Sequence, residues 1–144
     1  MMSNVKKEEE TILLSIYCDI IMTILKQHEM LSVNKIMVFS YLMKKNSYYY
    51  KNVYDGKTTQ KTVIKALSLL NGLKTDYYDN IIYILKSIDI LVAAEKIDYE
   101  KNNLLIKDKT YETSYEEGMF FRRAIDASEL ITDRQFLKEV MDNV

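Results

Sequence analysis

The residues that could support chemistry by type and spacing are few. Asp55-Gly56-Lys57-Thr58 contains the Gly-Lys-Thr string that ends a phosphate-binding loop. Such a loop needs the pattern GxxxxGK[ST], because several backbone N–H groups must surround the phosphates. The position of its first glycine is occupied by Lys51. We therefore interpret Asp55-Gly56 as a turn and expect no nucleotide-binding loop.

Cys18 and His28 are the single cysteine and the single histidine of the chain. Catalysis by a Cys–His pair needs an exposed thiolate, but the apolar neighbours Ile16 and Ile20 predict that Cys18 is buried. His28 is expected on the surface at the end of a helix, where it suits the helix dipole. One residue of each type also excludes a disulfide framework and the paired-ligand zinc motifs.

The acidic pairs Glu116-Glu117 and Asp76 with Asp79 lie at predicted helix starts. Acidic side chains are favourable there because they face the positive end of the helix dipole. Arg122-Arg123 is interpreted as part of an exposed helix face. The sequence thus predicts no catalytic, cofactor-binding or metal site, and a protein that is not an enzyme.

Charge is distributed unevenly, although the formal net charge is only −1. Residues 31–75 hold eight lysines against one aspartate, a net charge of +7, whereas residues 111–144 carry −4. The basic segment also contains tyrosines, a combination that can follow phosphates and stack on bases. A solvated lysine face or a protein interface explains it equally well, and the absence of arginine disfavours specific base readout. The candidate contacts to DNA or an acidic partner are Lys44, Lys45, Lys51, Lys57 and Lys61.

Nothing near the start of the chain resembles a secretory signal or a membrane anchor. The apolar run from Ile12 to Leu25 is interrupted by Asp19 and is shorter than the roughly 20 apolar residues that a spanning helix needs. We expect a soluble, cytoplasmic protein without membrane partners.

Helix is the expected state of most of the chain, which has three glycines and no proline. Apolar residues recur at helical spacing and predict helices at about 8–28, 33–45, 60–72, 77–92, 115–129 and 133–142. Alternation around 97–99 and the turn before Leu104 predict a small β-hairpin near 95–107. Ser32 is a predicted N-cap, and Ser114 with Glu117 and Thr132 with Gln135 are predicted capping boxes.

These elements predict a single domain of the mainly α (α+β) class. A helical bundle with a winged-helix-like core at about 10–108 would be followed by a C-terminal helical segment at about 112–144. Helices followed by a hairpin are the order of a winged helix, with the helix at 77–92 in the recognition position and the hairpin as the wing. Another mainly helical fold accounts for the same order.

Three stretches together resemble a known family. They are Leu31-Ser32-Val33-Asn34-Lys35-Ile36, the run from Ile81 to Leu91 leading into Leu104-Leu105-Ile106, and the ending from Ala124 to Val140. This pattern looks like the small middle component of bacterial ABC-ATPase three-component systems, which include the Lamassu-type anti-phage defences.

The resemblance implies a non-catalytic accessory subunit of an SMC-like ATPase with long coiled-coil arms. It would bridge or restrain an effector subunit, often a nuclease, and DNA within the complex could contact the basic segment. The family pattern supplies no catalytic residue. The candidate protein interface consists of Tyr48, Tyr49, Tyr50, Phe120, Phe136, Leu137 and Met141.

Other functions remain open from the sequence. A stand-alone winged-helix transcription regulator would bind DNA by itself with steep salt dependence, but the arginine-poor basic segment and the acidic end count against it. A small helical binding or inhibitor protein, including a kleisin-associated segregation factor, would share the adaptor chemistry and differ only in its partner.

Overall fold

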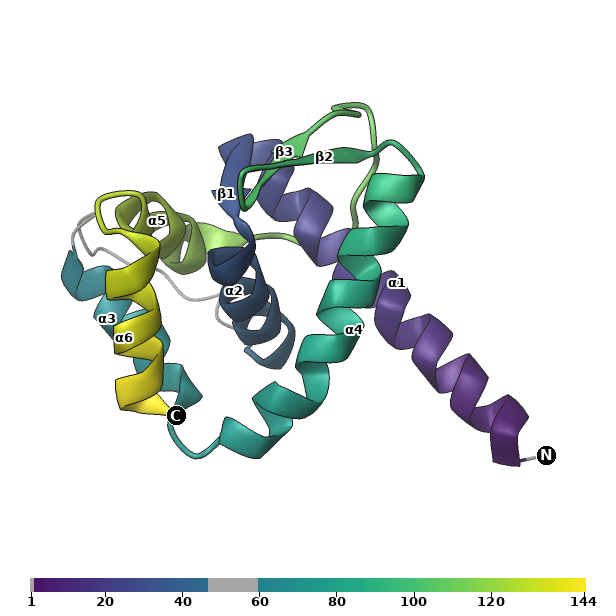
Figure 1. The fold of residues 1–144 in the computed structure, drawn as a ribbon, viewed down its shortest axis with the longest axis horizontal. Coiled ribbons are helices and arrows are strands. Elements are labelled where there is room, and N and C mark those ends of the chain that lie inside the picture. Colours follow the sequence, from purple (N-terminus) through teal and green to yellow (C-terminus); the bar gives the residue numbers. More distant parts are fainter. Residues whose placement is uncertain (1, 47–59) are drawn as a thin grey trace.

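The computed structural model describes residues 2–46 and 60–144. Its elements are ordered helices first, then a hairpin, then two further helices (Figure 1). They are α1 (Met2–His28), β1 (Met30–Ser32), α2 (Val33–Lys45), α3 (Gln60–Leu67), the 3₁₀ turn η2 (Ser68–Leu70), α4 (Lys74–Ala93), β2 (Ile97–Glu100), β3 (Asn103–Ile106), α5 (Gly118–Ser128) and α6 (Asp133–Asn143). The mainly helical α+β class predicted from the sequence is confirmed.

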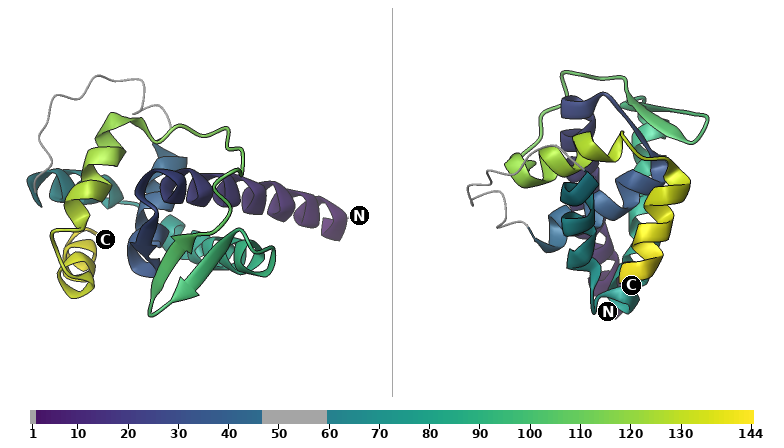
Figure 2. Two further views of the ribbon diagram at one scale, coloured as in Figure 1. Left: turned by 90° about the horizontal axis from the view of Figure 1, so that it is seen from above. Right: turned by 90° about the vertical axis from the view of Figure 1, so that its left-hand side faces the viewer.

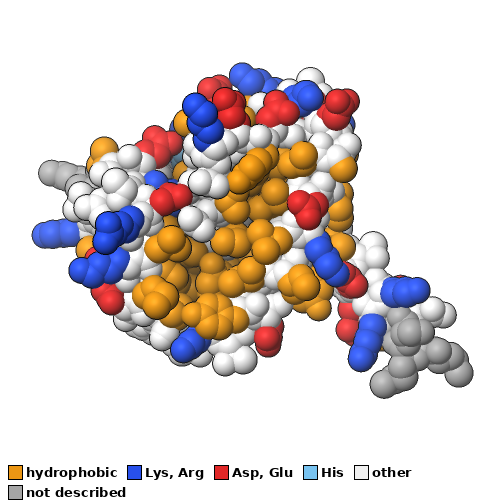
Figure 3. Space-filling view, in the orientation of Figure 1, with side chains coloured by type: hydrophobic (Ala, Val, Ile, Leu, Met, Phe, Trp, Pro, Cys, Tyr) orange, Lys and Arg blue, Asp and Glu red, His pale blue; other side chains and the backbone are white. Residues whose placement is uncertain are grey.

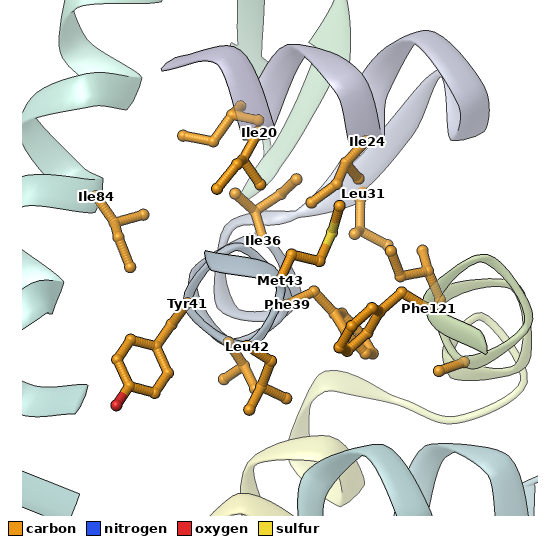
Figure 4. Close-up of a cluster of buried hydrophobic side chains, with 14 of the residues drawn as sticks. Ile20, Ile24, Leu31, Ile36, Phe39, Tyr41, Leu42, Met43, Ile84 and Phe121 are labelled. Carbon is orange, nitrogen blue, oxygen red and sulfur yellow. The ribbon is translucent and has the colours of Figure 1, made fainter. Parts of the chain in front are cut away.

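Helix α2 lies at the centre of the molecule. Figure 4 shows it nearly end-on, with apolar side chains of α1, α4 and α5 pointing toward it from three sides. Most of its residues are buried, and only Val33, Asn34, Met37 and Lys44 are partly exposed before the last residue. The predicted N-cap is confirmed, because the Ser32 hydroxyl accepts a hydrogen bond from the backbone N–H of Lys35 at 3.3 Å.

The hairpin belongs to a three-stranded antiparallel sheet with the strand order β1-β3-β2. Leu31 pairs with Leu104, and Tyr99 pairs with Leu104 from the other side. Lys101 and Asn102 form the two-residue turn, and both have positive φ angles, the backbone that a tight hairpin requires. Strand β1 is an addition to the predicted hairpin. Three residues are too few to show a period of their own.

Helix α3 ends earlier than predicted, and η2 leads into a turn at Gly72 with φ of +80°. Helix α4 then crosses α1: Tyr17 Oη donates to Asn80 Oδ1 at 2.7 Å, and Ser87 Oγ donates to the Leu14 carbonyl at 3.2 Å. Figures 1 and 2 show that the first turns of α1 extend beyond the other elements.

The two predicted capping boxes have different outcomes. Thr132 and Gln135 form one at the start of α6, with both reciprocal hydrogen bonds present. The Ser114–Glu117 box is wrong, because Ser114 bonds to Asp19 of α1 and α5 begins only at Gly118. Both side chains that the local pattern predicted to cap the helix instead form hydrogen bonds with residues of α1.

One hydrophobic core joins the helical bundle to the C-terminal helices. Phe39 of α2 and Phe136 of α6 are both fully buried, with ring centroids 5.6 Å apart. Helix α5 packs against α3 and α2, and Phe121 lies beside α2 in the same cluster (Figure 4). The predicted division at about 108–112 therefore does not separate two cores.

Candidate functional site

Helix α4 carries a stripe of apolar residues along one side, which we call the α4 seam. It consists of Tyr78, Ile81, Leu85, Ile88 and Val92, spaced by three and four residues in alternation. Tyr78, Leu85 and Val92 are 47%, 41% and 36% exposed, whereas Ile81 is partly buried and Ile88 is buried. This spacing is the one by which two helices pack along each other, yet the three outer residues of the seam remain open to solvent.

A hollow of about 430 Å³ lies beside the upper half of the seam. Its apolar lining comes from Leu85, Ile88 and Val92 of α4 and from Val33 at the start of α2. Met37 follows Val33 one turn later on the same side of α2 and is also partly exposed. Asn34, Asp89, Tyr99 and Asn102 complete the lining. We call the seam together with this hollow the apolar groove.

The apolar groove belongs to a larger apolar face. Figure 3 shows apolar side chains gathered across the middle of the molecule, over α2 and between α4 and α6, with charged groups mainly around the edge. Helix α6 contributes exposed apolar residues to the surface as well, since Leu137 and Met141 are 39% and 70% exposed. Contiguous exposed apolar surface of this kind marks a binding site rather than an ordinary solvated face.

Asp89 is the only charged residue that lines the hollow. It forms no hydrogen bond or ion pair with the residues that the structure describes. The nearby Lys86 points elsewhere and pairs with Glu10 of α1 at 2.7 Å. The groove therefore offers apolar contact and one unpaired carboxylate, an arrangement unsuited to phosphate.

The lysines predicted to contact DNA or an acidic partner do not form one described patch. Lys44 and Lys45 end α2, and Lys45 Nζ pairs with Asp76 Oδ2 at 3.0 Å. Lys61 is the second residue of α3, which Figures 1 and 2 place apart from the end of α2. Lys51 and Lys57, like the Gly-Lys-Thr string, lie outside the described residues.

Asp76 acts within the fold rather than as a simple cap of α4. Its carboxylate accepts a hydrogen bond from Tyr41 Oη at 2.5 Å in addition to the Lys45 contact. These two hydrogen bonds lower the pKa of Asp76, the tyrosine bond most strongly. One lysine of the basic segment 31–75 faces the interior of the protein. Lys35 Nζ donates to the carbonyls of Ser128 and Ile131 at 2.7 and 3.0 Å.

The residues predicted as a protein interface do not all lie on the surface. Phe120 and Phe136 are buried in the core, at 3% and 0% exposure, so they are removed from any surface that a partner could reach. Leu137 and Met141 are exposed, as an interface requires. Tyr48, Tyr49 and Tyr50 lie outside the described residues.

The environment of His28 differs most from the one that the sequence predicted. The predicted surface residue is buried, with 2% of its side chain exposed, and its Nε2 bonds to Glu117 Oε1. Its Nδ1 lies 3.0 Å from Asp126 Oδ1. A carboxylate oxygen faces each ring nitrogen, an arrangement that favours the imidazolium form, in which both nitrogens carry a proton and donate.

The pKa values of this cluster follow from burial and charge. Burial opposes the charged form of His28, but the hydrogen bond to Glu117 and the charges of Glu117, Asp126 and Glu129 outweigh it and raise the pKa of His28. Burial also raises the pKa of Glu117, against the effect of its hydrogen bond to His28. The Glu117 Oε2 atom is buried without a hydrogen-bond partner. The His28 and Glu117 side chains are enclosed, whereas Asp126 is 47% exposed at the edge of the cluster.

The remaining candidates for chemistry are also structural. Cys18 is buried as predicted, its thiol faces the Ser87 carbonyl at 3.7 Å, and burial raises its pKa. Among the described residues, no group of three or more His, Cys, Asp or Glu side chains could hold a metal ion. None of the described helices is long and apolar enough to cross a membrane.

The α4 seam could have been recognised in the sequence, since Tyr78, Ile81, Leu85, Ile88 and Val92 show the heptad pattern directly. The sequence-based prediction used the apolar residues of this helix only to place the helix itself. Comparison of the chain with protein-family models, with curated proteins and with solved structures finds no match.

Proposed function

We propose that the chain is a non-catalytic accessory subunit that acts by binding another protein. The observation that carries the proposal is the apolar groove, in which three large side chains of one helix are left open to solvent beside a hollow. Fully burying an exposed side chain of this size is worth about 1.5–3 kcal/mol. Because these three are 36–47% exposed, each would gain less than half of that on binding, and a partner must also cover the hollow and the surrounding apolar face to bind stably.

The partner implied by the sequence resemblance is an SMC-like ATPase with long coiled-coil arms. The proposed setting is a bacterial anti-phage defence complex of the Lamassu type, in which this chain bridges or restrains a nuclease-like effector. The groove supports the protein-binding part of this proposal, because an adaptor of this kind needs a docking surface and no chemistry of its own.

The alternative, a stand-alone winged-helix regulator, would require a different kind of surface on α4. In that interpretation α4 is the recognition helix and must present cations and hydrogen-bonding groups to DNA. Its open side instead presents Tyr78, Leu85 and Val92 beside the unpaired Asp89. The cation beside the seam is Lys74, whose Nζ lies 5.9 Å from the centre of the Tyr78 ring. The apolar side chains offer phosphates no hydrogen bond and the Asp89 carboxylate repels them, which favours the accessory subunit over the regulator.

The test is purification of the tagged chain from its host, with quantitative mass spectrometry of the proteins that accompany it. Leu85→Lys alters the groove, and Ile90→Lys alters an equally exposed residue (46%) on the opposite side of α4. We expect a large coiled-coil ATPase to accompany the unaltered chain and Ile90→Lys, and to be lost with Leu85→Lys. Recovery of salt-sensitive DNA and no protein would contradict the proposal and favour the regulator. Circular dichroism of both variants checks that they fold.

A further inference from the structure

We infer that the apolar groove receives a single amphipathic α-helix from the partner protein, packed lengthwise along the α4 seam. The inference rests on the proposed function, because it specifies how an accessory subunit would hold its partner. It commits to a helix that carries its own heptad stripe of apolar residues, flanked by a basic side chain opposite Asp89.

The spacing of the seam identifies the shape of the occupant. Ile81 and Ile88 pack against this chain's own core, which leaves Tyr78, Leu85 and Val92 as one line of open apolar side chains that repeats every seven residues along α4. A second helix with the same seven-residue repeat can place its side chains between those of such a line. An extended peptide would instead need unpaired backbone of a sheet edge, and the seam lies on a helix. From Tyr78 to Val92 the seam spans 15 residues, and its 14 steps of 1.5 Å make about 21 Å, which corresponds to about four turns of the bound helix.

The hollow shows that the bound helix touches more than α4. Val33 of α2 lines it, and so do Tyr99 and Asn102 of the hairpin. A helix lying on the seam would therefore rest between α4 and α2 and stop at the hairpin. This is the helix-in-groove mode of recognition, in which residues at i, i+3, i+4 and i+7 supply the contacts.

The charge of the groove further limits which helices could bind in it. Asp89 is the one charged residue in the described lining of the hollow and has no described partner, whereas Lys74 Nζ lies 5.9 Å from the centre of the Tyr78 ring at the other end of the seam. Covering it with an apolar or acidic surface would leave an unpaired carboxylate desolvated, which is costly. A lysine or arginine beside the apolar stripe of the bound helix removes that cost and sets the direction in which the helix lies.

A second copy of this chain fits the groove less well. A two-fold interface places the same patch on both subunits, so a hollow would face a hollow, and each Asp89 would remain without a cation. Nucleic acid is disfavoured by the same carboxylate. Both occupants are nevertheless distinguishable outcomes of the test.

The test is photo-crosslinking of the full chain in its host. p-Benzoylphenylalanine replaces Tyr78, Leu85 or Val92 in turn, and Ile90 serves as the matched control on the opposite side of α4. We expect the three groove positions to crosslink to one segment of one other protein, at sites that advance by about seven residues from each position to the next. Yield at Ile90 should be lower by about tenfold or more, and Asp89→Lys should reduce the groove yield by about tenfold.

Several results would overturn the inference. They are crosslinks to another copy of this chain, crosslinks to nucleic acid, partner sites without the seven-residue step, or no crosslinks at the groove positions. The proposed function is judged separately, by the identity of the partner. Seven-residue steps within a protein that is not an ATPase would leave the helix inference standing and refute the proposed complex, whereas an ATPase that crosslinks only elsewhere would do the opposite.

Discussion

Replacing His28 tests directly whether its interaction with Glu117 and Asp126 stabilises the folded chain. His28→Gln keeps a polar side chain but withdraws the positive charge that faces Glu117 and Asp126. The Glu117 side chain is only 7% exposed, and its Oε2 atom already lacks a hydrogen-bond partner. The substitution therefore leaves a carboxylate that is shielded from bulk water, with the charge of nearby Arg122 left to offset part of its own.

Breaking a buried ion pair by removing one partner costs about 3–5 kcal/mol. Small domains have a free energy of unfolding of about 5–15 kcal/mol, so this loss is a large fraction of the total. Unfolding entropy is about 2.1 cal/mol/K per residue, which for 144 residues converts the loss into a decrease in Tm of about 10–16 °C.

The assay is urea unfolding of the full chain at about pH 7, followed by circular dichroism, for a complete double-mutant cycle. Its members are the unaltered chain, His28→Gln, Glu117→Gln and the double variant. Because the double variant contains no buried carboxylate at position 117, we expect it to recover about half or more of the stability that His28→Gln loses.

Two results would refute this reasoning. One is a His28→Gln variant whose free energy of unfolding lies within about 0.5 kcal/mol of the unaltered chain, the size of an ordinary surface substitution. The other is strict additivity of the two single changes, which would mean that the His28 and Glu117 side chains do not interact.

Other predictions concern pH, core packing and capping. The raised pKa of His28 means that the folded chain holds this proton more tightly than the unfolded chain. Its stabilisation is complete below about pH 6.5 and is lost as the pH rises through the folded pKa, so the urea midpoint should fall as the pH is raised above about 6.5, and this step should be absent in His28→Gln. Phe136→Ala should cost about 3–5 kcal/mol and Met141→Ala less than about 0.5 kcal/mol in urea unfolding, and equal costs would show that the assigned burial is wrong. Thr132→Ala should cost about 1 kcal/mol through loss of the capping box, measured as a decrease in Tm, and no change would mean that this cap does not stabilise α6.

Local physical chemistry accounts for what was predicted correctly. Helices and the hairpin follow from the apolar period and from turn residues, both of which act over a few neighbouring positions. The Ser32 cap and the Thr132–Gln135 capping box follow for the same reason, since each closes a hydrogen bond within three residues. The burial of Cys18 follows from its apolar neighbours.

Local patterns were misleading where a distant element competed for the same side chain. Ser114 and Glu117 have the spacing of a capping box, but Asp19 and His28 of α1 bind them instead. Strand β1 has only three residues and exists because β3 supplies its hydrogen-bond partners. No window of the sequence contains those partners.

The amino-acid sequence by itself determined the helical class, the hairpin, the caps that close locally and the absence of paired metal ligands. Only the tertiary structure decided which apolar residues are core and which are surface. Phe136 and Leu137 are neighbours in the chain, yet one is fully buried and the other is 39% exposed. The reason is that hydropathy gives only the free energy that a side chain would gain if it were buried. Which side of α6 is buried is decided by the packing of that helix against α2. The α4 seam is open because no described helix of this chain lies along it.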